Sequence, residues 1–408
     1  MQDTPRGARL HIAIFGRRNA GKSSLINALT NQNIALVSDV PGTTTDPVYK
    51  AMEILPIGPV VIIDTAGIDD EGELGALRVE RTLQVLNKTD LALMVIDQAA
   101  GVSDWEEGLV AELKKRNIPV IGVVNKIDMG QPAAAETLNW TKRLAIPMVA
   151  VSAKTKQGVE ELKRQMIKHA PENWEGPPIL GDLITGGDTV VLVTPIDSAA
   201  PKGRLILPQV QAIRDVIDQD AIAVVVKETQ LADALANLRQ PPRLVVTDSQ
   251  AFKHVAAVTP DDVTLTSFSI LFARYKGDLE TLVAGAKAID GLKPGDRVLI
   301  AEGCTHHRQK DDIGTVKIPR WLQQKVGGEL KFEWVSGGNF PTDLEQYQLI
   351  VHCGACMLNR REMLYRLAVA REKGVPIVNY GVLIAYVHGI LPRVLMPFPA
   401  ARRVLDGK

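Results

Sequence analysis

The sequence predicts an α/β protein whose first domain is built on a mostly parallel β-sheet. Short runs of Val, Ile and Leu alternate with amphipathic segments that are long enough for helices. This alternation is typical of parallel strands that are covered by helices on both faces. A phosphate-binding loop motif stands between the first expected strand and the first expected helix. The length of 408 residues indicates about two to three domains.

The composition excludes several classes of protein. Hydrophobic residues make up 46% of the chain and charged residues 23%, as in ordinary globular proteins. Lys and Arg number 47 and Asp and Glu number 47, and this balance argues against a general nucleic-acid binder. Three cysteines cannot form a disulfide framework. We see no signal peptide and no apolar run of about 18 residues, so we expect a cytoplasmic protein with no membrane partner.

The first stretch of the chain should form the parallel sheet, and a linker rich in Pro and Gly follows it at residues 170–178. Strands are expected at residues 10–15, 60–63, 91–96, 120–124 and 148–151. Helices are expected at residues 22–29, 74–86, 105–115 and 158–167.

The rest of the chain repeats the α/β theme twice. A second stretch has expected strands at 190–193, 222–226 and 244–246 and helices at 209–217, 230–238 and 249–257. It carries no catalytic constellation and is interpreted as a small dimerisation domain. A third stretch has an expected helix at 271–289, strands at 297–301, 331–335, 349–351 and 377–378, and helices at 319–325 and 360–373. The predicted domain boundaries are 1–172, 179–267 and 268–408.

The P-loop motif runs from Gly16 to Ser23 as Gly-Arg-Arg-Asn-Ala-Gly-Lys-Ser. Its glycines allow backbone N–H groups to curl around phosphates at a helix N-terminus, which favours anions. Lys22 can neutralise the β- and γ-phosphates, and the Ser23 hydroxyl can ligate Mg²⁺.

Three further motifs follow in the order that a guanine-nucleotide site requires. Asp64-Thr65-Ala66-Gly67 places a carboxylate near Mg²⁺ and a glycine near the γ-phosphate. Asp128 closes Asn125-Lys126-Ile127-Asp128 and can accept two hydrogen bonds that guanine offers and adenine does not. Ser152-Ala153-Lys154 stands where a backbone contact to the guanine O6 is expected. The predicted nucleotide site comprises Gly16, Asn19, Ala20, Gly21, Lys22, Ser23, Ser24, Asp64, Gly67, Asn125, Lys126, Asp128, Ser152, Ala153 and Lys154.

Residues 1–170 resemble a small GTPase domain of the TrmE–Era type. The resemblance matches residues 41–46 to switch I and implies that Thr44 is a Mg²⁺ ligand. Ile68 stands where Ras-like enzymes have a water-orienting glutamine, so hydrolysis needs another route. Asn19 matches an asparagine that holds K⁺ in potassium-activated relatives; the alternative is that it only stabilises the loop turn. Lys22, Thr44 and Asn19 are therefore the expected catalytic residues.

The three cysteines form a second candidate site with neighbouring histidines. Cys304 precedes His306 and His307, and His352 precedes Cys353 and Cys356. If strands 297–301 and 349–351 are parallel neighbours, both loops emerge at the same sheet edge. Three interpretations stay open from the residues: an iron–sulfur cluster with one exchangeable site, a Cys₃His zinc site, or a redox dithiol whose thiol pKa values are lowered.

Together, the potassium-type GTPase and the Cys-x-His…His-Cys-x-x-Cys pattern resemble the HydF family, the maturation GTPases of FeFe-hydrogenases. The resemblance implies GTP/GDP, Mg²⁺, K⁺ and a 4Fe–4S cluster held by Cys304, Cys353 and Cys356. His352, His306 and His307 are then the candidates for the fourth ligand. It also implies a homodimer that carries a transient diiron precursor, with HydE, HydG and apo FeFe-hydrogenase as partners.

A second class of function stays open. Relatives of the first domain act in RNA modification or ribosome assembly, and the C-terminal cysteines would then form a zinc or redox site. The neutral net charge and the cysteine motif favour the hydrogenase-maturation interpretation.

Overall fold

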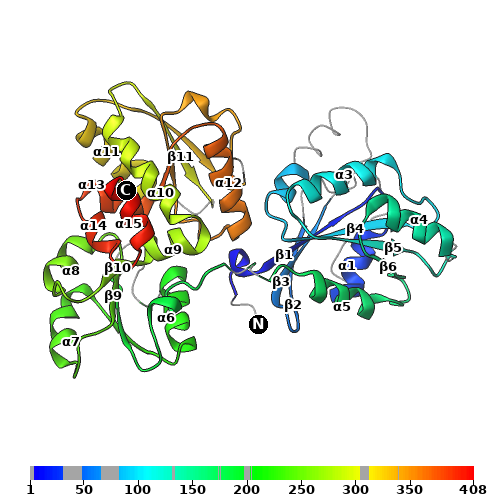
Figure 1. Ribbon diagram of the computed structural model, residues 1–408, viewed down its shortest axis with the longest axis horizontal. Coiled ribbons are helices and arrows are strands. Elements are labelled where there is room, and N and C mark those ends of the chain that lie inside the picture. The colour runs from blue at the N-terminus through cyan, green and yellow to red at the C-terminus, as the bar shows by residue number, and fades with distance from the viewer. Residues whose placement is uncertain are drawn as a thin grey trace. The chain divides into compact units, whose positions relative to one another are not determined.

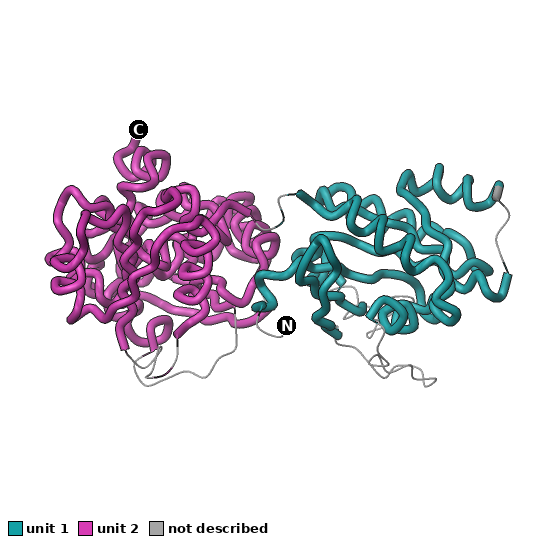
Figure 2. The backbone as a smooth tube through the Cα atoms, turned by 90° about the horizontal axis from the view of Figure 1, so that it is seen from below, with its two compact units in different colours: residues 1–175 teal, residues 176–408 magenta. Residues whose placement is uncertain are grey.

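The computed structural model describes residues 4–30, 48–65, 82–130, 134–172, 174, 176–196, 203, 205–303, 312–338 and 340–408. The chain divides into two compact units, Met1–Glu175 and Gly176–Lys408, which Figure 2 shows in teal and magenta. Among the described residues, no helix has the length and apolarity needed to cross a membrane.

Unit 1 is built on a six-stranded sheet with the order β2-β3-β1-β4-β5-β6. Its strands are β1 (Leu10–Phe15), β2 (Val48–Ile54), β3 (Gly58–Asp64), β4 (Leu91–Asp97), β5 (Val120–Asn125) and β6 (Met148–Ala150). All neighbours pair in parallel except β2, which runs antiparallel to β3 at the edge. The carboxyl ends of β1, β3, β4 and β5 therefore share one edge of the sheet, where ligands bind in such folds.

Helices cover both faces of this sheet, as Figure 1 shows. Helices α1 (Lys22–Thr30) and α5 (Val159–His169) pack on the face that contains Ile12 and Ile14 of β1. Helix α3 (Asp104–Lys115) packs on the face that contains Ala13 and Phe15, and α4 (Ala134–Leu144) contacts α3. Alternate residues of a strand point to opposite faces, so a strand buried on both sides must be apolar throughout.

Unit 2 contains two four-stranded parallel sheets. The first has the order β10-β9-β7-β8. Its elements are η2 (Gly181–Leu183), β7 (Thr189–Val193), α6 (Leu207–Asp218), β8 (Ile222–Val226), η3 (Glu228–Gln230), α7 (Leu231–Asn237), β9 (Leu244–Thr247), α8 (Phe252–Val258) and β10 (Leu265–Ser267). Strand β8 forms one edge of this sheet.

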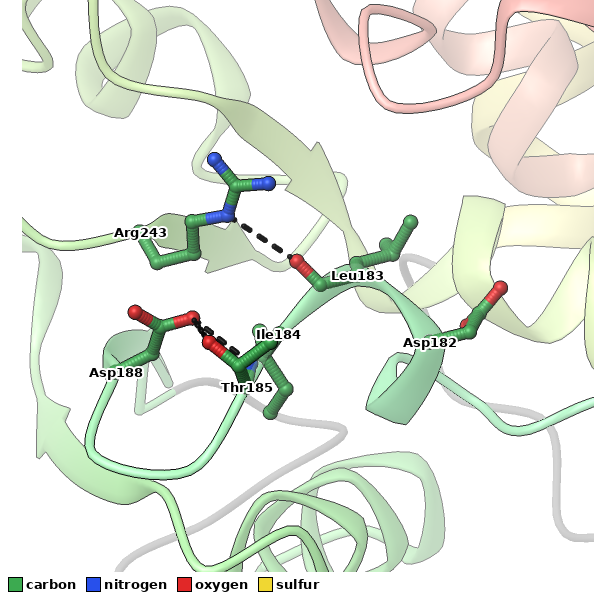
Figure 3. A pocket seen from close by; sticks show the side chains of 6 residues that line it. All are labelled: Asp182, Leu183, Ile184, Thr185, Asp188 and Arg243. Carbon is green, nitrogen blue, oxygen red and sulfur yellow. Dashed lines mark hydrogen bonds between the residues drawn. The ribbon is translucent and has the colours of Figure 1, made fainter.

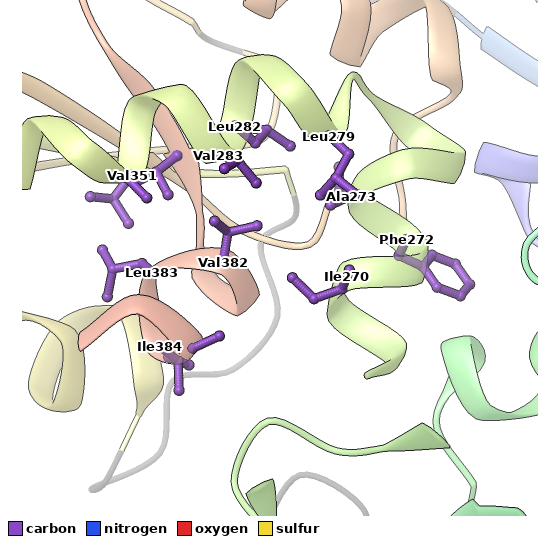
Figure 4. Packing of buried hydrophobic residues seen from close by; sticks show 14 of the residues in the cluster. Ile270, Phe272, Ala273, Leu279, Leu282, Val283, Val351, Val382, Leu383 and Ile384 are labelled. Carbon is purple, nitrogen blue, oxygen red and sulfur yellow. The ribbon is translucent and has the colours of Figure 1, made fainter. Parts of the chain in front are cut away.

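The second sheet has the order β12-β11-β13-β14. Its strands are β11 (Arg297–Glu302), β12 (Lys331–Ser336), β13 (Leu349–His352) and β14 (Ile377–Asn379). The helices are α9 (Phe268–Lys276), α10 (Leu279–Lys287), η4 (Ala288–Gly291), η5 (Ile313–Lys317), α11 (Ile318–Val326), η6 (Leu344–Gln346), α12 (Arg360–Glu372), α13 (Tyr380–Val387), α14 (Leu391–Val394) and α15 (Pro399–Asp406). One hydrophobic cluster extends from Ile179 to Ala401 across both sheets, and Figure 4 shows the part where α9, α10 and α13 meet.

The predicted α/β class is confirmed, but some elements differ from the prediction. The expected single helix 271–289 is wrong because the helix is interrupted at Gly277. A second helix starts after Asp278, whose carboxylate caps it by accepting the Thr281 N–H at 2.8 Å. Two strands were not expected. Strand β2 is an edge strand in which polar and apolar residues are mixed, so it lacks the apolar run that marked the other strands. Strand β10 is only three residues long. Residues 74–81 of the expected helix 74–86 lie outside the described part of the chain.

Candidate functional site

The P-loop lies between β1 and α1 and leaves no room for larger side chains at its glycines. A Cβ atom at Gly16 would lie 2.4 Å from the carbonyl oxygen of Val95. One at Gly21 would lie 2.2 Å from Asn125 Nδ2, and the φ of Gly21 is +92°. Asn19 also has a positive φ of 59°, a conformation that asparagine tolerates better than most residues.

Lys22 is held over the loop that should cradle the phosphates. It is the first residue of α1 and is buried. Its Nζ donates to the carbonyl oxygens of Gly16, at 2.7 Å, and Arg17, at 2.9 Å. The ammonium group is thus fixed at the helix N-terminus, where a phosphate would accept from the same group.

Ser23, the second residue of α1, meets Asp64 at the carboxyl end of β3. The Ser23 hydroxyl donates to Asp64 Oδ2 at 2.9 Å. Burial raises the pKa of Asp64, opposed by the Ser23 hydrogen bond and by the charge of Lys22. A hydroxyl and a partly buried carboxylate are hard oxygen ligands of the kind Mg²⁺ prefers, so this pair fits the predicted metal position.

Asn125 connects the P-loop with the loop that should contact guanine. Its Nδ2 donates to the carbonyl oxygen of Ala20 at 2.9 Å, and its Oδ1 accepts from the Ala153 N–H at 3.1 Å. The Ser152 hydroxyl donates to Asp128 Oδ1 at 2.6 Å, which orients this exposed carboxylate. The structure therefore brings Ala20, Asn125, Asp128 and the loop of residues 152–154 together at one edge.

Two acidic residues that were not predicted from the sequence, Asp97 and Glu106, hold basic residues of the site. Lys126 Nζ pairs with Asp97 Oδ2 at 2.7 Å. Burial of Asp97 would raise its pKa, but its bonds to Lys126 and to the Ala99 N–H hold the pKa below the ordinary value. Arg17 of the P-loop donates to the buried Glu106 at 2.7 Å. Asp97 is the last residue of β4, as Asn125 is the last residue of β5. A polar residue at the carboxyl end of an apolar strand was the sequence signal that could have identified Asp97 as part of the site.

Part of the predicted nucleotide site lies outside the described residues. These residues are Thr44, within the switch I match 41–46, and Gly67. Ile68, at the position of the Ras-like glutamine, also lies outside the described residues. Ser24 is the third residue of α1, and Lys154 is exposed on the loop after β6.

The cysteine motif follows β13, which is the parallel neighbour of β11. The register pairs Ala301 with His352. Cys353 Sγ accepts the Gly303 N–H at 3.0 Å and the Ala355 N–H at 3.4 Å. Gly303 directly precedes Cys304, so the two cysteine loops start from one sheet edge, as expected. Cys304, His306 and His307 themselves lie outside the described residues.

His352 has both ring nitrogens occupied by protein partners. Nδ1 lies 2.8 Å from the carbonyl oxygen of Cys353, and Nε2 lies 3.0 Å from Arg366 Nη1. Burial, with the charge of Arg366, lowers the pKa of His352 to about 3, so the ring is neutral. Since Arg366 is always a donor, Nε2 accepts and Nδ1–H donates. His352 would have to break one of these bonds to ligate iron.

The surroundings of the cysteines are desolvated. Burial raises the pKa of both the Cys353 and the Cys356 thiol. The lowered thiol pKa values expected for a redox dithiol are therefore wrong, because burial outweighs the N–H groups of Gly303 and Ala355, which by themselves lower the pKa of Cys353. Two buried cations lie near the thiols: Arg366 near Cys353 and Lys276 near Cys356. Neither was predicted.

The described residues alone do not bring three potential His, Cys, Asp or Glu ligands around one point. Cys304 would supply the third thiolate. A separate pocket of about 300 Å³ is lined by Asp182, Leu183, Ile184, Thr185, Asp188 and Arg243 (Figure 3). The Asp188 carboxylate accepts hydrogen bonds from the Thr185 N–H and hydroxyl. Arg243 Nε donates a hydrogen bond to the Leu183 carbonyl oxygen. This pocket contains no residue of either predicted site.

Three family models match successive parts of the chain. Residues 11–126 match the 50S ribosome-binding GTPase. Residues 179–277 match the Hydrogen maturase F dimerization domain, and residues 280–397 match the Hydrogen maturase F tetramerization domain.

Similar proteins match mainly in the GTPase part. The tRNA modification GTPase MnmE of Chromobacterium violaceum is 36% identical over 160 residues, 39% of this chain and 34% of MnmE. GTPase Der of Sulfurihydrogenibium sp. is 34% identical over 176 residues, 41% of this chain and 39% of Der. The chain thus spans little more than a third of the length of these relatives. A crystal structure of Aquifex aeolicus Era with GDP and AlF4− is 22% identical, with a TM-score of 0.37, and covers 61% of this chain and 97% of Era.

The fold and the nucleotide-site geometry define the first unit as a P-loop GTPase domain. The two Hydrogen maturase F models together match more than half of the chain. The chain belongs to the hydrogen maturase F family (HydF), the hydrogenase maturation GTPases.

Proposed function

We propose that this protein is a GTP-hydrolysing scaffold that binds a 4Fe–4S cluster and delivers a diiron precursor to apo FeFe-hydrogenase. The observation that carries this proposal is the hydrogen bond between Cys353 and the residue that precedes Cys304 in the chain. Cys353 Sγ accepts the amide of Gly303, the residue before Cys304, at 3.0 Å. Cys304, Cys353 and Cys356 would hold the cluster. Amide hydrogen bonds to sulfur are among the features that set cluster potentials.

The nucleotide site supports GTP and Mg²⁺ as substrate and cofactor. Lys22 would neutralise the phosphates, Ser23 and Thr44 would hold Mg²⁺, and Asp64 would orient the ion's ligands. Asp128 would select guanine. Asn19 would hold K⁺ beside the phosphates, where the cation supplies positive charge to the transition state.

The donor set also fits an iron–sulfur cluster. Three thiolates leave one iron for another ligand, and soft thiolates in a desolvated site suit Fe–S clusters. His352 is engaged by Arg366, and His306 and His307 stay candidates for the fourth ligand from the sequence.

A homodimer is supported by the surface of the first sheet of unit 2. Strand β8 is an edge strand, and Ile222 and Val225 on it are each more than 40% exposed, as are Val210 and Ile217 on α6. An unpaired strand edge with exposed apolar side chains is a template for pairing with another chain. The family match of residues 179–277 is to a dimerization domain.

HydE and HydG would supply the diiron unit in the cytoplasm, with no nucleic acid or membrane involved. The test is a maturation assay in which apo FeFe-hydrogenase is activated by the purified proteins. Wild type should activate it, and Cys356→Ala should fail although it retains GTPase activity. Full activation by Cys356→Ala would refute the cluster role. RNA-dependent stimulation of the GTPase without any activation would instead favour the RNA-processing alternative.

A further inference from the structure

The carboxylate of Glu106, in the first turn of α3, has partners on two sides. Glu106 is fully buried, and its Oε2 accepts the Ser103 N–H at 2.9 Å and the Ser103 hydroxyl. These bonds form the capping box of α3, which satisfies the start of the helix locally. Its Oε1 accepts from Arg17 Nε at 2.7 Å, across 89 positions of the sequence. Helix capping does not require this second partner, which belongs to the P-loop.

The guanidinium group of Arg17 is committed to the start of α3. Besides its bond to Glu106, its Nη2 donates to the carbonyl oxygen of Gly101 at 2.6 Å. Gly101 is itself held in place, since its N–H donates to the Asp97 carbonyl at 3.0 Å and a Cβ atom on it would lie 3.1 Å from the Trp140 ring. A buried carboxylate that loses its cation is strongly destabilising, so Glu106 keeps this side chain from turning toward a phosphate.

The backbone of Arg17 contacts the P-loop lysine. Lys22 Nζ donates to the carbonyl oxygens of Gly16 at 2.7 Å and Arg17 at 2.9 Å. An ammonium group on a flexible four-carbon stem has no fixed direction of its own, so the two carbonyls set where its charge lies. Gly16 is fixed by close packing on β4, where a Cβ atom would lie 2.4 Å from the Val95 carbonyl oxygen. The Arg17 peptide is fixed instead through its side chain.

We propose that Glu106 is a positioning residue for GTP hydrolysis and that it acts through Arg17 on Lys22. The carboxylate holds the guanidinium group, which fixes the Arg17 peptide, and the carbonyl of that peptide directs Lys22 Nζ. Charge that is preorganised in this way stabilises a transition state because nothing has to rearrange during the reaction. Arg17 is then a tether and not a phosphate ligand. The inference rests on the GTPase activity of the first unit and is independent of the cluster that we propose.

The test measures kcat and KM for GTP in the full-length protein, with thermal unfolding of the same preparations. Arg17→Met removes the guanidinium group and keeps an unbranched apolar side chain. Its kcat should fall by about tenfold or more with little change in KM, because displacing a catalytic group by about 1 Å can cost about a hundredfold. Glu106→Gln should lower kcat in the same direction but by less, since the Gly101 carbonyl still accepts from Arg17. A pair that only stabilised α3 would lower the unfolding temperature and leave kcat unchanged.

Glu107→Gln is the matched control. Glu107 is the next residue of α3, and its Oε1 accepts from Arg143 Nε at 2.7 Å, the distance found in the Arg17–Glu106 pair. Arg143 belongs to α4, so this pair joins two helices and leaves the P-loop untouched. Glu107→Gln should turn over GTP at the wild-type rate. A loss of kcat equal to that of Glu106→Gln would show that any change in α3 slows the reaction, and would overturn the proposal.

The double variant Arg17→Met/Glu106→Gln distinguishes a tether from a direct phosphate ligand. Both changes remove the same link, so the double variant should be no slower than Arg17→Met alone. Losses that multiply would show that the two residues act separately, and they would overturn the proposal, as would a wild-type kcat in either single variant. The double variant leaves no unpaired charge at the buried position. It therefore supplies the kcat to compare with Glu106→Gln and wild type if Arg17→Met does not fold.

Discussion

The hydroxyl of Ser152 donates a 2.6 Å hydrogen bond to Oδ1 of Asp128. Ser152 is fully buried, and its own oxygen accepts the Thr155 N–H at 3.1 Å. The exposed Asp128 carboxylate is therefore oriented by a buried partner.

Asp128→Asn should weaken GTP binding and shift the preference toward xanthine nucleotides, whose extra carbonyl accepts from an amide. A hydrogen bond to a charged group contributes about 1.5–3 kcal/mol, so the Kd for GTP should rise at least about tenfold. Nucleotide titration measures both affinities. Ser152→Ala is the control: it should weaken GTP binding less and show no preference for xanthine. Unchanged GTP preference in Asp128→Asn would show that the base lies elsewhere.

Lys22→Ala should abolish GTP turnover and leave the cysteine site intact. The ammonium group is fixed 2.7 Å from the Gly16 carbonyl, and no other residue assigned to the site supplies a cation there. Phosphate release and iron content should be measured on the same preparation. Lys142→Ala, at an exposed lysine of α4, should behave as wild type. Turnover by Lys22→Ala at the wild-type rate would contradict the phosphate role.

The sequence predicted the places of these residues in the fold well where motif and strand end coincide. Gly21, Lys22, Ser23, Asp64 and Asn125 each sit at the junction that the apolar runs indicated, because parallel strands place all such junctions on one edge.

Contacts between distant segments could not be predicted in this way. Arg366 bonds His352 and the Gly337 carbonyl, and Gly176 touches Arg360, although neither arginine belongs to a recognisable motif. Such pairs depend on the packing of α12 against the sheet and α9, which a single sequence does not encode as a local pattern.

GTP hydrolysis should require potassium through Asn19. A fixed cation would stabilise the charge of the transition state, as an arginine finger does, and arginine fingers raise kcat by about 10³–10⁵-fold. Asn19→Gly removes the side-chain oxygen while allowing the positive φ of 59°. Rates should be compared in K⁺ and Na⁺ buffers. Wild type should be faster in K⁺, Asn19→Gly should lose the difference, and Asn19→Asp should retain it. Equal wild-type rates in both buffers would remove potassium from the mechanism.

Asp64→Asn should stabilise the nucleotide-free protein at neutral pH and abolish stabilisation by Mg²⁺ and GTP. Burial raises the pKa of Asp64 in the folded protein above its pKa in the unfolded chain. The protonated carboxyl therefore contributes to folding stability at a pH below the unfolded-state pKa, and this contribution is lost as the pH rises through the folded-state pKa. An amide has no such titration. Ligand at 100 times its Kd adds about 2.7 kcal/mol to wild type, which the variant should lack. Thermal unfolding from pH 4 to 8 checks both effects, and a variant less stable than wild type at pH 7 without ligands would contradict this account.

In the function that we propose, Cys304, Cys353 and Cys356 together hold a 4Fe–4S cluster. The most direct measurement is the iron and sulfide content of anaerobically reconstituted protein, with the EPR spectrum of its reduced form. Because a 4Fe–4S cluster contains four iron and four sulfide ions, wild type should contain about four of each per chain. Its reduced form should give the EPR signal of a reduced cluster. Alanine at any one of the three cysteines should lose both. Zinc without iron in wild type, or an intact cluster in the Cys304→Ala variant, would contradict the claim.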